Sequence, residues 1–367
     1  EGFMNNMRDN FILSYKTHLQ IHARGYDETR QVEGAMREPA PALAYLATRP
    51  EVVAASERLT VSGLASVARA ATAVNIVGVD PEREARATKL KQFVIAGTWF
   101  PAGDARALLL GARLVERLDI DLGDKVILTA QNPAGDIVAE VFHLRGVLQS
   151  SAPEIDYAAA LIPLASARAL LDMPGATEIV VRVGDIAQVD SVYAGARAAL
   201  PADEFEVLRW WELDPLVKQQ LEFNAAYAFV VILVVIMVAV AQILNTLLMS
   251  LQERLREFGL MAALGTQRWQ LGRMLLWESL VLVTLGAVIG YGIGALAALY
   301  FAHVGIDLSM FSNVMRFFYM DTVLYPQLTA ALSGRIVGAT AIATVLVSLY
   351  PAWRAARLDP VVAMRRL

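Results

Sequence analysis

The chain has 367 residues, no cysteine, a formal net charge of -4 and a hydrophobic content of 56%, and its mean hydropathy is +0.46. The lack of cysteine excludes disulfides and cysteine metal sites, and this hydropathy is high for a soluble protein. Residues 1–224 hold 22 Lys and Arg against 30 Asp and Glu, whereas residues 225–367 hold 10 against 6, with no basic patch suited to nucleic acid.

The acidic front part, residues 1–224, reads as an α/β domain. Its strand-like runs are rich in Val and Ile and are bounded by Gly, Asp or Pro. They lie at 73–79, 125–130, 137–148, 158–162, 178–183 and 205–208. Helices are predicted at 37–46, 105–118, 164–171, 186–200 and 213–223. In 105–118, the spacing of Leu110, Leu114 and Leu118 predicts one helix face that packs on a sheet, with Asp104 as the N-cap.

Three long runs without charge follow, at 224–252, 279–306 and 336–353. A helix of about 25 residues is about 37 Å long, and the hydrocarbon core of a bilayer is about 30 Å thick. The sequence therefore predicts transmembrane helices at 225–252, 276–302 and 336–353.

The arginines near these spans predict the orientation. Four lie between the first and second spans and four in the tail 354–367, but only two in 303–335. The positive-inside rule then places a coupling segment, 253–275, and the C-terminal tail in the cytoplasm. The loop 303–335 and the domain 1–224 are expected on the outer side.

A large outer domain must be exported, yet the chain starts EGFMNNMRDN, without an apolar run. We therefore expect four transmembrane helices in the full protein, with the first absent from this chain. A cleaved signal peptide is the alternative.

Known catalytic and nucleotide-binding motifs are absent from the sequence. There is no G-x-x-x-x-G-K-[ST], no G-x-S-x-G and no H-E-x-x-H. His18 and His22 could share one face, but no third metal ligand lies near them, so we interpret them as ordinary core or surface histidines. We predict no catalytic residue, no metal site and no cofactor in this chain.

The segment ERLREFGLMAALGTQRWQL, residues 253–271, follows the first span. Alternating charges give way to small residues, and Leu264-Gly265 is expected to end a helix with a C′ glycine. A short helix with small residues and a charged edge suits docking into a groove of a cytoplasmic partner. The alternative, which composition alone favours, is a plain basic loop.

Small and polar residues within the spans indicate helix contacts. Gly286, Gly290 and Gly294 form two overlapping G-x-x-x-G patterns, which allow close approach within one chain, the favoured interpretation, or between protomers. Asn245 and Gln242 could hydrogen-bond across an interface or to neighbours in the same chain.

Residues 253–271 resemble the E-R-x-R-E-x-G-x-x-x-A-L-G segment of the MacB/FtsX/LolC-LolE class of ABC-transporter permeases, the mechanotransmission or type VII class. The ending YPAWRAARLDPVVAMRRL, residues 350–367, resembles the P-A-x-R-A-A-x-x-D-P-x-x-A-L-R ending of that class. Residues 14–26 are similar to the segment after the first helix in lipoprotein-release members. Residues 76–85 and 104–128 are similar to the periplasmic core domain.

The resemblance implies a four-helix permease of the bacterial inner membrane, with a MacB-like α/β periplasmic core domain between helices one and two. It implies a homo- or heterodimer of permeases and a cytoplasmic ABC ATPase dimer, which binds ATP and Mg. Carried over by motif, the ATPase-coupling residues are Glu253, Arg254, Arg256, Glu257, Gly259, Ala263, Leu264 and Gly265. The C-terminal motif residues are Pro351, Arg354, Ala355, Ala356, Asp359 and Pro360.

The class also implies how such a permease works, because ATP binding closes the ATPase pair and moves the outer domains. Extraction of a lipoprotein or lipid from the membrane is the leading hypothesis. The alternatives are MacB-like efflux and FtsX-like signalling to a cell-wall hydrolase. A periplasmic adaptor as a further partner would favour efflux, whereas a periplasmic carrier would favour lipoprotein release. A membrane-anchored enzyme is a third, but the chain lacks a catalytic constellation.

Overall fold

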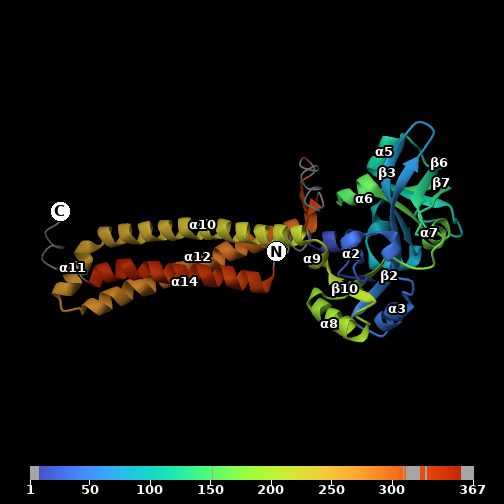
Figure 1. Ribbon diagram of the computed structural model, residues 1–367. Helices are drawn as coiled ribbons and strands as arrows, with labels where there is room; N and C mark the ends of the chain where they lie inside the picture. The colour runs from blue at the N-terminus through green and yellow to red at the C-terminus, as the bar shows by residue number, and fades with distance from the viewer. Residues whose placement is uncertain (1–7, 151, 309, 311–322, 327–328, 357–367) are drawn as a thin grey trace. The chain divides into compact units, whose positions relative to one another are not determined.

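The computed structural model describes residues 8–150, 152–308, 310, 323–326 and 329–356. The chain divides into two compact units (Figure 1). An α/β unit extends to residue 219, and a helical unit takes in residues 220–307 and the chain from 323 onward.

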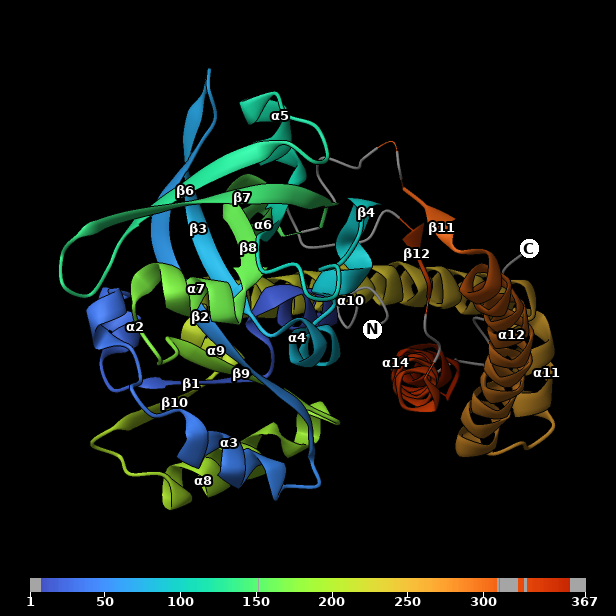
Figure 2. The same ribbon diagram turned by 90° about the vertical axis from the view of Figure 1, so that its right-hand side faces the viewer.

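The strands of the α/β unit form one mixed sheet. They are β1 Leu19–Ala23, β2 Val52–Ser66, β3 Ala71–Val79, β4 Val94–Gly97, β5 Ala107–Gly111, β6 Lys125–Gln131, β7 Ile137–Leu148, β8 Ala159–Pro163, β9 Glu178–Val183 and β10 Phe205–Arg209. Pairing runs from β2 through β3, β8, β5, β7 and β6 back to β2, so these strands close into a barrel (Figure 2). From β2 the sheet also continues through β9 and β1 to β10.

Short helices cover the sheet. They are α2 Tyr26–Thr29, α3 Ala40–Ala47, α4 Pro81–Ala87, α5 Ala112–Leu118, α6 Pro153–Ala158, α7 Leu164–Leu171, α8 Val189–Ala199 and α9 Trp210–Leu213, with a π-helix at Ile12–Lys16 and 3₁₀ turns at Val32–Gly34, Leu90–Phe93 and Ile186–Gln188. The barrel core, which includes Leu59, Ile76 and Phe142, also takes in leucines of α5 and α7. A second core lies between α3, α8 and the β9–β1–β10 strands.

The strand predictions for β3, β6, β7, β8, β9 and β10 are confirmed, but the helix predicted at 105–118 is partly wrong. Residues 107–111 form β5, and only 112–118 are helical. The run Ala107–Gly111 is buried throughout, with β7 on one side and β8 on the other, and a short buried strand cannot be told from a helix by apolar spacing. Asp104 caps no helix, since it accepts hydrogen bonds from the Arg106 N–H at 3.1 Å and from Arg145 Nε at 2.8 Å.

The long strand β2 joins the two parts of the sheet. Residues 52–58 pair with β9, and residues 58–66 pair with β3. At the junction lies Arg58, whose side chain is fully buried and binds Glu84 through two hydrogen bonds, of 2.6 and 3.3 Å. Arg58 Nη1 also donates to Glu178 at 3.1 Å, and the guanidinium lies 4.2 Å from the ring centre of Tyr15. An ion cluster therefore ties β2 to α4 and β9.

Both histidines singled out in the sequence are buried beside β9. The Val183 N–H donates to His18 Nδ1 at 3.2 Å, and His22 Nε2 lies 2.9 Å from Gln20 Oε1. Burial lowers the pKa of His18 to about 4 and also lowers the pKa of His22. These are core histidines, which is the interpretation that the sequence favoured.

Three described helices are long and apolar enough to cross a membrane. The helical unit holds α10 Pro215–Glu253 from residue 220 onward, together with α11 Leu255–Ala263, α12 Arg268–Val304 and α14 Ala330–Ala356. It also holds the short strands β11 Ile306–Asp307 and β12 Val323–Leu324. The predicted spans lie inside α10, α12 and α14. Figure 1 shows α12 and α14 alongside each other in this unit.

Candidate coupling segment and cavity between the helices

The coupling segment predicted at 253–275 contains the short helix α11, held between the end of α10 and the start of α12. Gly265 adopts a φ of 101°, and the Thr266 N–H donates to the Met261 carbonyl at 3.0 Å. This hydrogen bond and the left-handed glycine form a C′ glycine cap of the Schellman kind, as the Leu264-Gly265 pair predicts. The chain can then turn into α12 at Arg268.

One face of α11 is buried within the helical unit. Phe258 is fully buried and packs with Leu251 of α10 and Leu271 of α12, next to Met261 and Leu276. This small cluster fixes how α11 lies against the two long helices. Gly259 is buried too.

Arg254 forms ion pairs with two glutamates of the same chain. Its Nε donates to Glu257 at 3.1 Å, and its Nη1 lies 3.2 and 3.1 Å from the two carboxylate oxygens of Glu278 on α12. The hydrogen bond to Glu257 is the largest cause that raises the pKa of Arg254, so the guanidinium stays charged. Since the guanidinium also lies 5.3 Å from the ring centre of Phe258, Arg254 positions α11 against α12.

The opposite face of α11 is open to its surroundings. Arg256 is exposed and makes no ion pair with any described residue. Leu260 and Leu264 follow it at four-residue spacing and are 55% and 80% exposed, so all three share one side of the helix end. Ala263 is exposed beside them. We call Arg256, Leu260, Ala263 and Leu264 the α11 face.

The structure thus separates the predicted coupling residues into two groups. Arg254, Glu257 and Gly259 hold α11 in place, whereas Arg256, Ala263 and Leu264 are presented outward, and Glu253 and Gly265 are exposed at the flanking turns. Leu260 belongs to the α11 face but was not among the predicted residues. Its spacing from Arg256 and Leu264 was the sequence feature that could have identified it.

The C-terminal motif is only partly within the described residues. Pro351 is buried inside α14, and residues 354–356 form the end of that helix. Asp359 and Pro360 lie outside the described residues.

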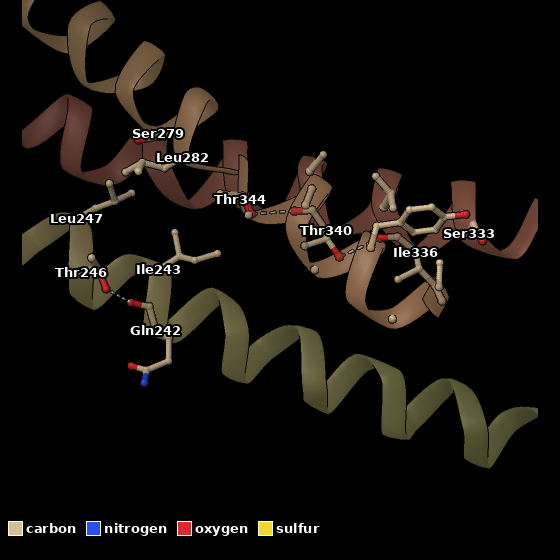
Figure 3. Close-up of a pocket in the computed structure, with 18 residues that line it drawn as sticks. Gln242, Ile243, Thr246, Leu247, Ser279, Leu282, Ser333, Ile336, Thr340 and Thr344 are labelled. Atoms are coloured by element: carbon tan, nitrogen blue, oxygen red, sulfur yellow. Dashed lines mark hydrogen bonds between the residues drawn. The ribbon is translucent and has the colours of Figure 1, made fainter. Parts of the chain in front are cut away.

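A cavity of about 770 Å³ lies between α10, α12 and α14 (Figure 3). Its wall is mostly apolar, with hydroxyl side chains such as Thr246, Ser333 and Thr340. Gly286, Gly290 and Gly294 also line it. A Cβ built on any of these glycines would meet no described atom within 4 Å, so the structure does not support the favoured interpretation of close packing within the chain.

Comparison with known families identifies the helical unit. Residues 229–360 match the family model described as FtsX-like permease C-terminal. The chain carries an FtsX-like permease domain. It is an ABC-transporter permease of the type that includes LolC, LolE, MacB and FtsX.

Relatives of this FtsX-like permease differ in how much of the chain they match. It is 23% identical to the lipoprotein-releasing system transmembrane protein LolE of Haemophilus influenzae, over 86% of this chain and 78% of LolE. It is 21% identical to the corresponding LolC of Xylella fastidiosa, over 99% of this chain and 88% of LolC. The macrolide export ATP-binding/permease protein MacB of Syntrophobacter fumaroxidans is 27% identical over 44% of this chain, but this match spans only 20% of MacB.

Solved structures align with part of this permease at low identity. The periplasmic region of MacB from Actinobacillus actinomycetemcomitans aligns with a TM-score of 0.41 and 15% identity, over 60% of this chain and 98% of that one. The extracellular domain of the noncanonic ABC-type transporter YknZ from Gram-positive bacteria aligns with a TM-score of 0.40 and 15% identity, over 53% of this chain and all of that one.

Proposed function

We propose that this chain couples ATP hydrolysis by a separate cytoplasmic ATPase to movement of its α/β unit, and that the transporter releases lipoproteins or lipids from the inner membrane. The observation that carries the proposal is the extent of similarity to the lipoprotein-releasing proteins. The match to LolE covers 86% of the chain and includes both the α/β unit and the helices, whereas the match to MacB covers 44%.

The α11 face supplies the contact with the ATPase. A helix that presents an exposed arginine followed by exposed leucines fits a groove with an apolar floor and an acidic rim. Burial of one such leucine stabilises a complex by about 1.5–3 kcal/mol. The internal clamp of Arg254 on Glu278 keeps α11 in a fixed position on α12, so a force on the α11 face is passed to a candidate membrane span.

Substitutions that place a negative charge on the α11 face test whether this face binds the ATPase. The full chain, tagged and expressed in its native membrane, is purified with its ATPase, and the bound ATPase and its ATP hydrolysis are measured. We expect the Arg256→Glu and Leu264→Asp variants to be recovered without bound ATPase. Their α/β unit should remain folded, which is checked by its resistance to protease. Arg335→Glu, the same charge reversal on an exposed arginine of α14, is the control and should keep the ATPase bound. Equal recovery of the ATPase in all variants refutes the docking assignment.

The substrate is tested in proteoliposomes that contain the purified complex. A fluorescent acylated lipoprotein is placed in the membrane, and its release is followed after ATP addition. We expect ATP-dependent release, which the Arg256→Glu complex lacks. ATP hydrolysis that responds to a macrolide but not to the lipoprotein would favour the efflux alternative instead.

A further inference from the structure

A second hollow of the helical unit, of about 370 Å³, lies between α12 and α14, near the start of α12 and the end of α14. We call it the α12–α14 groove. The Ser348 hydroxyl in its wall donates to the Val345 carbonyl of the same helix at 2.8 Å, so it offers little to a ligand. The wall is mostly apolar and carries one cation; it includes Arg273, Trp277 and Leu280 of α12 and Val345, Ser348 and Leu349 of α14.

The α12–α14 groove opens on the side of α12 that faces away from α10 and α11. Leu271 packs with Leu251 and Phe258, so it marks the side of α12 that meets those two helices. Arg273 follows Leu271 by two residues, which places the two side chains about 200° apart around the helix axis. Trp277, one turn after Arg273, is 61% exposed. The groove is therefore open to the surroundings of the helical unit, and no described residue of α10 or α11 lines it.

Arg273 places a positive charge at the end of the groove nearest the start of α12. Its guanidinium lies 4.6 Å from the ring centre of Trp269, and the side chain is exposed and makes no ion pair with any described residue. Arg273 precedes the predicted span 276–302 by three residues, about 4.5 Å along the helix. The headgroup layer is about 5–8 Å deep on each side of the hydrocarbon core. Arg273 therefore lies at the depth of lipid phosphates, on the side that the positive-inside rule assigns to the cytoplasm.

We infer that the α12–α14 groove binds an anionic phospholipid of the cytoplasmic leaflet. One acyl chain lies along the apolar wall, and the phosphate accepts hydrogen bonds from Arg273. A guanidinium matches the geometry of a phosphate, and basic pockets between membrane helices on the cytoplasmic side bind anionic headgroups. Trp269 and Trp277, four residues to either side of Arg273, lie at the depth where indole rings are favourable. The inference goes beyond the proposed function, because it requires neither the ATPase nor a lipoprotein.

The competing occupants of the groove are proteins, either the additional transmembrane helix that we expect in the full protein or a second copy of the chain. Either would have to supply a carboxylate to Arg273 or leave its charge against apolar side chains, which is unfavourable in a membrane. A helix is also about 10–12 Å across, so it would lie over the rim and leave the groove unfilled. A phospholipid fills the groove with a hydrocarbon chain and pairs the cation with a phosphate, so it accounts for both features.

Trp277 can report what occupies the groove, because brominated lipids quench tryptophan fluorescence at short range. The full protein, with any segment that precedes residue 1, is reconstituted into phosphatidylcholine liposomes that contain brominated phosphatidylglycerol, and separately into phosphatidylglycerol liposomes that contain brominated phosphatidylcholine. The quenching assigned to Trp277 is the part that Trp277→Phe removes. We expect phosphatidylglycerol to be preferred at this position about 5-fold, which is the effect of one arginine near a membrane surface.

Substitutions separate the groove from a general attraction of anionic lipid to the chain. Arg273→Gln should abolish the preference, and Arg273→Lys should keep most of it. Arg256→Gln is the matched control, because it removes an exposed arginine that the positive-inside rule places on the same side but that does not line the groove, and it should leave the preference unchanged. Soluble glycerol phosphate, which lacks acyl chains, should not relieve the quenching.

Equal quenching of Trp277 by the two brominated lipids, or a preference that survives Arg273→Gln, overturns the inference. Absence of quenching by either lipid would show that a further helix or a second copy covers the groove, and relief by glycerol phosphate would show a site for free anions; both results overturn it as well. The measurement includes no ATPase, so its failure leaves the proposed coupling through the α11 face intact.

Discussion

Replacement of Arg58 by methionine should strongly destabilise the α/β unit. Methionine keeps part of the apolar length of the side chain but removes the cation from between Glu84 and Glu178. Glu84 is fully buried and the Glu178 side chain is 12% exposed, so both carboxylates remain buried without Arg58. Removal of one member of a buried ion pair costs about 3–5 kcal/mol, against a typical total stability of about 5–15 kcal/mol.

The stability that the α/β unit loses on Arg58→Met should also depend on pH, and the direction can be derived from Glu178. Burial raises the pKa of Glu178, but the charges of Arg58, His22 and Lys16 and the hydrogen bond from Arg58 together hold that pKa below its usual value. Without Arg58, burial dominates and the pKa of Glu178 rises in the folded state. A carboxyl group with a raised folded pKa destabilises the fold as the pH climbs above about 4.3, its unfolded value. The stability gap between parent and variant should therefore be wider at pH 7 than at pH 4.

Pulse proteolysis of the full chain in nanodiscs, across a urea series, gives the fraction of folded α/β unit. The triple variant with Arg58→Met, Glu84→Gln and Glu178→Gln should recover most of the loss, because no charge is left buried. Arg113→Met, which removes an exposed arginine paired with Glu116, is the control and should leave the midpoint unchanged. If Arg58→Met lowers the free energy of unfolding by less than about 1 kcal/mol, with no dependence on pH, then the two buried carboxylates do not need Arg58 and the prediction is refuted.

Two further predictions concern His18 and Gly265. Because burial lowers the pKa of His18 to about 4, the unfolded chain takes up the proton first, and the α/β unit should lose about 2 kcal/mol between pH 7 and pH 5. His18→Asn, which keeps an acceptor for the Val183 N–H but does not titrate, should flatten this slope in thermal unfolding; an unchanged slope contradicts the assignment. Gly265→Ala forces a side chain into φ 101° and should speed hydrogen exchange across 261–267, more than Gly265→Asn does. Unchanged exchange in both variants would show that the cap is not needed.

Local sequence patterns predicted the parts of this fold that depend on residues close together in the sequence. The three uncharged runs became α10, α12 and α14, because a long apolar stretch allows few structures other than a membrane helix. The Val- and Ile-rich runs became strands, and Leu264-Gly265 ended α11 because a left-handed C′ position favours glycine. The motifs at 253–265 and 350–360 placed the chain among the FtsX-like permeases.

Long-range packing decided what these patterns could not. Strand β2 was not among the predicted strands, and its Arg58 is fully buried against Glu178, 120 residues away, a contact that no local pattern shows. The run 107–111 became a strand because β7 and β8 enclose it.

The candidate site shows the same division. The sequence identified Arg254 and Arg256 together, and only the tertiary contact with Glu278 showed that Arg254 is an internal clamp while Arg256 remains open. The sequence placed Asn245 and Gln242 in a span, but their lack of a described partner depends on which side of α10 packs inward. Apolar runs and caps act over one or two helical turns, whereas burial and pairing depend on segments that meet only after the chain has folded.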